Sequence, residues 1–209
     1  MLFLYSYSII TAQPFYEDIQ AFKKQDSLNF PPKQAILLVG SSSFTNWKDV
    51  QNYFPQFTIV NRGFGGSSIS DVIRYAEDII FPYQPKQIVI YCGENDLAGS
   101  DTVTAKMVFQ RFVQLFTLIR NKMPAVPMAF ISLKPSPSRW HLNNKMIETN
   151  TLIKKYLHKK KKTNFIDVYH KMLDANGTPI KEIFIEDNLH MNAKGYAIWQ
   201  KIIEPYLKK

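Results

Sequence analysis

The chain has 209 residues, of which 45% are hydrophobic and 21% are charged. This size and balance are typical of one folded domain, and they exclude an intrinsically disordered chain and a membrane-embedded protein. The formal net charge is +9, but the lysines are scattered and only residues 159–162 form a run. Because this run follows a predicted helix and no nucleic-acid-binding motif accompanies it, we expect a solvated helix end and no nucleic-acid partner.

The first twelve residues form an apolar stretch that ends in small residues and is too short to span a bilayer. We interpret residues 1–12 as a signal peptide cleaved near Ala12, which predicts a periplasmic or secreted protein without stable membrane insertion. Since no basic segment precedes this stretch, an N-terminal element of a cytoplasmic protein is the alternative. Residues 13–209 then form one domain, which opens with a polar arm over residues 13–32 that we expect to wrap the surface.

Five short, mostly apolar runs are predicted to be strands, and the first three lead into small or polar residues. They cover residues 36–39, 57–61, 87–92, 126–132 and 164–168. Helices are expected between and after them, from about residue 46, from 70 to 79, from 100 to 122, from about 146 to 157 and from about 196 to 206. This alternation predicts a five-stranded parallel sheet between two helix layers, which is a three-layer α/β/α sandwich.

Candidate reactive residues follow several of these strands, where the carboxyl ends of a parallel sheet meet. A serine hydrolase needs a nucleophile, a base, a carboxylate that orients the base, and donors for the developing oxyanion. The chain offers Ser42 as nucleophile, His190 as base and Asp187 as orienting carboxylate, with Ser42, Gly66 and Asn95 as oxyanion donors. The Asp-x-x-His spacing lets the carboxylate reach one ring nitrogen while the other faces the serine.

Four blocks together resemble the SGNH hydrolases, also called the GDSL-type lipase and esterase family, over nearly the whole chain. The blocks are Gly40-Ser41-Ser42, Asn61-Arg-Gly-Phe-Gly-Gly66, Gly93-Glu-Asn-Asp96 and Asp187-Asn-Leu-His190. The resemblance implies the flavodoxin-like SGNH hydrolase fold, a triad of Ser42, Asp187 and His190, an oxyanion hole of Ser42, Gly66 and Asn95, and neither a metal nor a cofactor.

One residue departs from the family pattern, because Ser41 stands where the family's first block ordinarily has aspartate. The resemblance implies that this aspartate is not a member of the catalytic triad. The difference at Ser41 therefore concerns the turn geometry and the rate rather than the reaction class. Ser42 alone keeps the family's spacing from Gly40. Its neighbours Ser41 and Ser43 are then expected to bond to the local backbone.

The resulting prediction is a serine esterase that acts on a short-acyl or carbohydrate-borne ester through an acyl-enzyme. A lipolytic acylhydrolase acting on a lysophospholipid or thioester is the alternative within the same class. A catalytically inactive domain that binds a glycan or lipid is the alternative from another class. Arg139, in a proline-rich loop after the fourth predicted strand, is a candidate for binding an anionic group of the substrate, although a helix entry explains this loop equally well.

Overall fold

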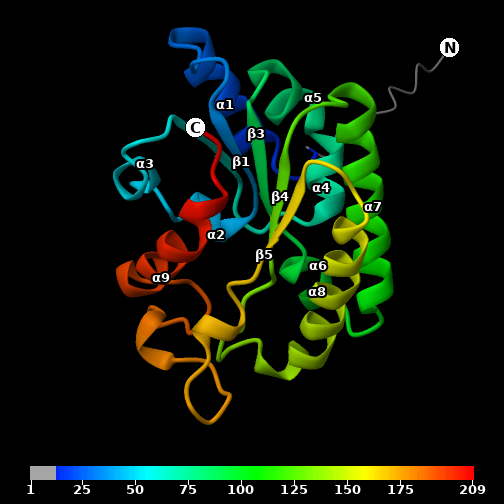
Figure 1. Cartoon of the computed structure of the whole chain (residues 1–209), viewed down its shortest axis with the longest axis vertical. Helices are drawn as coiled ribbons and strands as arrows, with labels where there is room; N and C mark the ends of the chain where they lie inside the picture. Colours follow the sequence, from blue (N-terminus) through cyan, green and yellow to red (C-terminus); the bar gives the residue numbers. More distant parts are fainter. Residues whose placement is uncertain (1–12) are drawn as a thin grey trace, which may run out of the picture.

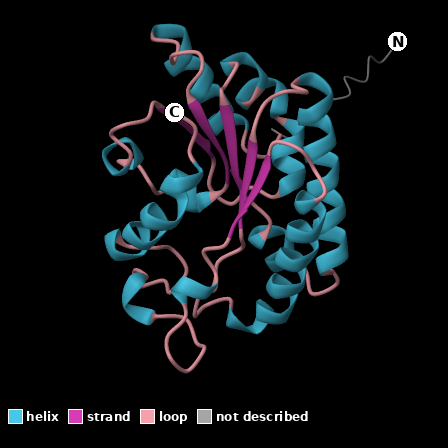
Figure 2. Cartoon of the chain, viewed as in Figure 1, coloured by secondary structure: helices cyan, strands magenta, loops and turns pink. Residues whose placement is uncertain are grey.

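The computed structural model describes residues 13–209, and the predicted signal peptide lies outside the described residues. Five parallel strands form one sheet in the order β2-β1-β3-β4-β5, with helices on both faces (Figures 1 and 2). In chain order the strands are β1 (Ile36–Gly40), β2 (Ile59–Gly63), β3 (Gln87–Tyr91), β4 (Met128–Ile131) and β5 (Thr163–Ile166). The predicted three-layer α/β fold is therefore confirmed.

The helices divide into two layers around the sheet (Figure 1). One layer contains α1 (Tyr16–Leu28), α4 (Ile69–Arg74), α5 (Ala76–Ile79), α7 (Ala105–Lys122) and α8 (Asn143–His158). The other contains α2 (Ser42–Thr45), α3 (Val50–Tyr53) and α9 (Ala193–Ile203). The short α6 (Glu94–Ala98) follows β3. Of the 3₁₀ turns, η1 (Phe81–Tyr83), η2 (Trp140–Leu142), η3 (His170–Met172) and η4 (Lys181–Ile183) lie in the connections, and η5 (Glu204–Tyr206) follows α9.

The central strands β1 and β3 are buried and, apart from Gln87, lack strongly polar side chains, because both of their faces are covered. Every residue of β1 and of β3 is buried. Within β1, Leu37 and Val39 pack toward the first helix layer, whereas Ile36 and Leu38 pack toward the second. This alternation is the two-residue period of a strand, and it fixes the register of β1 in the sheet. Ser42 therefore lies just beyond the carboxyl end of β1.

Local structure differs from the sequence prediction at several points. The polar segment expected to be an arm contains α1, which buries only Ile19 fully and so lacks a clear apolar stripe. The helix expected from residue 46 is replaced by α2, which begins at Ser42, and by α3. The single helix expected from 70 to 79 is divided into α4 and α5, and α4 is capped by Ser68, whose side chain forms a capping box with Asp71.

No helix in the described part of the chain combines the length and the apolar character needed to cross a bilayer.

Candidate active site

The turn that presents Ser42 depends on a glycine at the end of β1. Gly40 has φ of +147°, and a Cβ atom added there would lie 1.8 Å from the carbonyl oxygen of Tyr91. Only glycine tolerates both the conformation and the close approach to β3. The chain can therefore turn sharply at the sheet edge and enter α2 with Ser42 as its first residue.

The three adjacent serines differ in their access to solvent. Ser41 and Ser43 are buried, with 3% and 2% of their surface exposed, whereas Ser42 is partly exposed. The amide of Ser41 donates to the Tyr91 carbonyl at 3.1 Å, and its carbonyl accepts from the amide of Phe44 at 2.9 Å. These bonds are made by the Ser41 backbone, whereas its side chain forms no capping hydrogen bond at α2, so the expectation that this side chain would bond to the local backbone is wrong. Of the three serines, only Ser42 is open to solvent.

Asp187 and His190 form a direct pair. Nδ1 of His190 lies 2.5 Å from Oδ2 of Asp187, while Oδ1 of Asp187 accepts from the amides of Leu189 and His190 at 2.8 and 2.9 Å. Partial burial acts to raise the pKa of Asp187, but the hydrogen bonds from the His190 amide, the His190 ring and the Leu189 amide outweigh it and hold this pKa at about 2. The carboxylate therefore stays charged and directs Nε2 of His190 away from itself.

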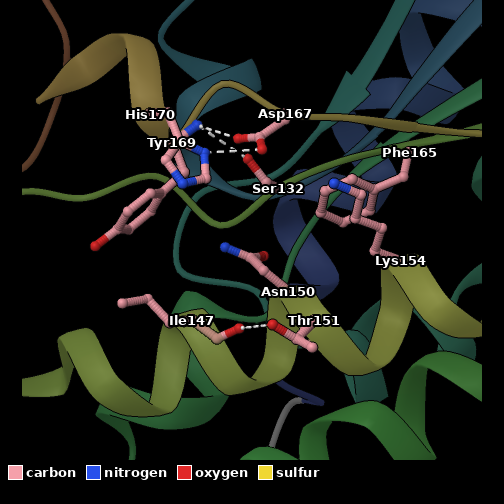
Figure 3. Close-up of a pocket in the computed structure, with 9 residues that line it drawn as sticks. All are labelled: Ser132, Ile147, Asn150, Thr151, Lys154, Phe165, Asp167, Tyr169 and His170. Atoms are coloured by element: carbon pink, nitrogen blue, oxygen red, sulfur yellow. Dashed lines mark hydrogen bonds and ion pairs between the residues drawn. The ribbon is translucent and has the colours of Figure 1, made fainter.

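A second Asp-x-x-His pair, which the sequence analysis overlooked, lies after β5. Nδ1 of His170 is 2.9 Å from Oδ2 of Asp167, and Figure 3 shows the two side chains close to Ser132. Ser132 is fully buried, and its Oγ accepts from the amides of Val168 and Tyr169. The His170 side chain is 76% exposed, against 23% for that of His190. Because Ser132 is inaccessible, we assign this pair no catalytic role.

A cavity of about 140 Å³ lies beside the second pair, between α8 and the segment that follows β5 (Figure 3). Most of its polar groups already have partners within the chain. Asn150 bonds to the backbone of Leu133 through both side-chain atoms, and the Thr151 hydroxyl donates to the Ile147 carbonyl. The cavity therefore offers few free groups to a ligand.

The predicted oxyanion donors come from three strand ends. Gly66 has φ of +82° in the loop after β2, a conformation that favours glycine. Within residues 13–209, the amides of Ser42 and Gly66 donate no hydrogen bond to another group of the chain. Nδ2 of Asn95, at the start of α6, donates to the carbonyl of Ser67 at 3.0 Å, which leaves its second N–H available. Two amides and one carboxamide hydrogen are thus unengaged in the described residues, and the oxyanion hole that they would form together stays a prediction.

Two hydrogen bonds connect loops that carry predicted site residues. Ser67 Oγ donates to the carbonyl of Gly40 at 3.3 Å, and the Ser138 amide donates to the carbonyl of Asn188 at 3.1 Å. In the described chain Ser42 and His190 are not hydrogen-bonded to each other. Contacts between nucleophile and base are often long in unliganded enzymes and tighten when substrate binds.

A buried ionic cluster lies under this edge of the sheet. Nζ of Lys134 is 3.3 Å from Oε2 of Glu94, which also accepts from the Tyr91 hydroxyl at 2.5 Å. Burial lowers the pKa of Lys134, and the Glu94 carboxylate opposes that effect. Sequence reasoning missed this cluster, although Glu94 stands inside the third block and Lys134 begins the proline-rich loop.

Solved structures of other proteins share this fold over most of the chain. The chain is similar to a candidate platelet activating factor from Streptococcus pneumoniae, with 18% identity, a TM-score of 0.80 and 92% of each chain covered. It is similar to a GDSL-like lipase from Bacteroides thetaiotaomicron, with 18% identity, a TM-score of 0.73, and 90% of this chain and 96% of that chain covered. At such identities the likeness establishes the fold.

A more distant likeness is to a mutant acetyl-xylooligosaccharide esterase from Geobacillus, with 13% identity, a TM-score of 0.65, and 83% of this chain and 94% of that chain covered. A search of curated protein sequences found no match. Residues 32–198, in contrast, match the family model described as the GDSL-like Lipase/Acylhydrolase family, a span that includes all four sequence blocks. The chain therefore belongs to the GDSL-like lipase/acylhydrolase family.

Proposed function

We propose that the protein is a serine esterase that hydrolyses a short-acyl or carbohydrate-borne carboxylic ester through an acyl-enzyme. The observation that carries this proposal is the Asp187–His190 pair, whose carboxylate is fixed by two backbone amides and by the imidazole. With Nδ1 engaged by Asp187, Nε2 is the ring nitrogen that can accept a proton.

In the first half-reaction, Ser42 Oγ attacks the ester carbonyl carbon and its proton passes to Nε2 of His190. The carbonyl oxygen becomes an oxyanion, which accepts hydrogen bonds from the amides of Ser42 and Gly66 and from Nδ2 of Asn95. Collapse of this intermediate breaks the bond to the alcohol oxygen, and the alcohol leaves with the proton held by His190. Asp187 stabilises the imidazolium in the meantime.

In the second half-reaction, a water molecule gives a proton to His190 and its oxygen attacks the acyl carbon. The same three donors receive the second oxyanion. Collapse releases the carboxylic acid, and Ser42 Oγ takes back the proton from His190. Each step uses groups of the chain together with substrate and water.

The preference for small acyl groups draws support from two proteins of the same fold. One is the acetyl-xylooligosaccharide esterase, and the other is an acetyl esterase mutant with an acetate ion, similar to this chain with 15% identity and a TM-score of 0.63. The likeness to the GDSL-like lipase favours the alternative hypothesis, in which the substrate is a lipid ester. A series of acyl chain lengths separates the two.

The decisive experiment is labelling with a fluorophosphonate, which phosphonylates activated serines, followed by peptide mass spectrometry. We expect one adduct, on Ser42, and a fall of up to about 10⁶-fold in kcat on p-nitrophenyl acetate for Ser42→Ala. Ser43→Ala, a neighbouring buried serine, is the matched control and should keep both labelling and turnover. A wild-type protein that neither labels nor hydrolyses esters would instead be the inactive glycan- or lipid-binding domain.

A further inference from the structure

Both ends of the Asn95 carboxamide are held by neighbouring groups. Nη2 of Arg139 donates to Oδ1 of Asn95 at 2.8 Å, and Nδ2 of Asn95 donates to the carbonyl of Ser67 at 3.0 Å. A guanidinium can only donate and a carbonyl can only accept. The two partners therefore select the same orientation of the amide, with its oxygen toward Arg139 and its nitrogen toward Ser67.

This orientation decides whether Asn95 can serve an oxyanion. The second N–H of Nδ2 is free to donate, whereas the flipped amide would present its oxygen to the developing negative charge and repel it. The contact with Arg139 is charge-assisted, so it also polarises the carboxamide and makes its N–H groups better donors. Arg139 thus affects the oxyanion site through Asn95.

The loop that carries Arg139 is fixed at two points. Lys134, at its start, is 1% exposed and pairs with Glu94, the residue that precedes Asn95. Ser138, next to Arg139, donates its amide to the carbonyl of Asn188 in the loop that bears Asp187 and His190. The Arg139 guanidinium therefore comes from a segment that is bonded both to α6, which carries Asn95, and to the loop between Asp187 and His190.

We propose that Arg139 is a positioning residue that locks the Asn95 carboxamide in the orientation that donates to the oxyanion. This inference rests on the proposed function and deepens it. It assigns to Arg139 a role different from the one expected from the sequence, which was binding of an anionic group of the substrate.

The test is a double-mutant cycle of Arg139→Ala and Asn95→Ala, with kcat and KM measured on the neutral ester p-nitrophenyl acetate. In the wild-type background, we expect Arg139→Ala to lower kcat about 10- to 100-fold, somewhat less than the 10²- to 10³-fold typical for removal of a donor, with KM nearly unchanged. In the Asn95→Ala background, the same substitution should have almost no further effect. Arg139→Lys should recover part of kcat, because an ammonium can still donate to Oδ1.

Three results would overturn the inference. The first is an equal fall in kcat in both backgrounds, and the second is an unchanged kcat for Arg139→Ala. The third is a rise in KM confined to an anionic ester such as p-nitrophenyl hemisuccinate, which would return Arg139 to substrate binding. Circular dichroism of each variant checks the fold. Fluorophosphonate labelling of Ser42 in wild-type protein tests the proposed function independently, so the two failures are distinguishable.

Discussion

The hydroxyl of Tyr196 donates a hydrogen bond of 2.9 Å to the carbonyl of Ser43, although the two residues are 153 positions apart. Tyr196 lies in α9, which begins three residues after His190, and Ser43 directly follows Ser42. The Tyr196 ring also stacks on Trp47, with centroids 4.7 Å apart. The helix that follows the predicted base is thus fastened to the helix that presents the predicted nucleophile.

We expect Tyr196→Phe to impair catalysis without unfolding the protein. The ring stack remains, so the loss of stability should be near the net value of one hydrogen bond, about 1 kcal/mol. The alignment of Ser42 with His190 should loosen, which lowers kcat and leaves KM almost unchanged. Tyr53→Phe is the control, because Tyr53 belongs to the same aromatic cluster and its hydroxyl has no hydrogen-bond partner in the described residues. Equal effects of both substitutions on kcat would contradict the alignment role.

The two Asp-x-x-His pairs provide an internal comparison. His190→Ala should abolish nearly all esterase activity, by a factor approaching that of Ser42→Ala, since the triad acts as a unit. His170→Ala should leave kcat and KM within about twofold of wild type, because the serine that lines the cavity beside His170 is the buried Ser132. Steady-state kinetics on p-nitrophenyl acetate measures both. Loss of activity in His170→Ala with retained fold would show that the second pair takes part in the reaction.

Asp187 should remain ionised in the folded protein at pH 3. Its pKa is about 2 in the folded protein, whereas the pKa of an unperturbed aspartate is about 3.9. Between these two pH values Asp187 is more often protonated in the unfolded chain than in the folded protein. Its contribution to stability is therefore present above about pH 4 and is lost as pH falls toward 2. The contribution is small, because 42% of the side chain is exposed.

The ¹³C resonance of the Asp187 carboxyl carbon, followed by NMR while the protein remains folded, checks this expectation. A midpoint near pH 4 in folded protein would mean that the amides of Leu189 and His190 do not hold the carboxylate. The same result would weaken the argument that Asp187 is a permanent anion beside His190.

The edge of the sheet at which the reactive residues gather could be predicted from the sequence. Ser42, Gly66 and Asn95 each follow a short apolar run, and parallel strands bring such positions together whatever the details of the loops. The spacing of Asp187 and His190 likewise predicts their contact, because three residues of a turn suffice to bring carboxylate and ring together.

The remaining features depend on tertiary contacts that no local pattern encodes. Asp167 and His170 have the same spacing as the predicted pair, and only the burial of Ser132 and the exposure of His170 set them apart. The contact between Arg139 and Asn95 joins residues 44 positions apart, and it depends on the path of a proline-rich loop. The helix α1 escaped prediction because it has a single fully buried residue.

The last prediction concerns the size of the acyl group. A long acyl chain gains affinity only where it finds apolar surface, about 0.8 kcal/mol for each buried methylene, which is roughly a fourfold change in kcat/KM. Exposed large apolar side chains in residues 13–209 are few: Tyr16, Leu28, Phe30, Met107, Ile147, Ile185 and Tyr206. Of these, only Ile185 lies in the segment of the predicted Asp187–His190 pair, where its amide donates to the His190 carbonyl.

We therefore expect kcat/KM on p-nitrophenyl esters to be highest at about two to four acyl carbons and to gain little beyond them. A candidate apolar surface for a longer chain is Trp140, one residue after Arg139, which borders a cavity of about 420 Å³ together with Pro137 and residues of the 174–182 segment. The measurement is a series from acetate to decanoate on wild-type protein and on Trp140→Ala. A steady rise in kcat/KM through decanoate that Trp140→Ala removes would place the acyl chain along that cavity. Such a rise would favour the lipolytic acylhydrolase over the short-acyl esterase, because a steady gain with chain length requires that each added methylene is buried.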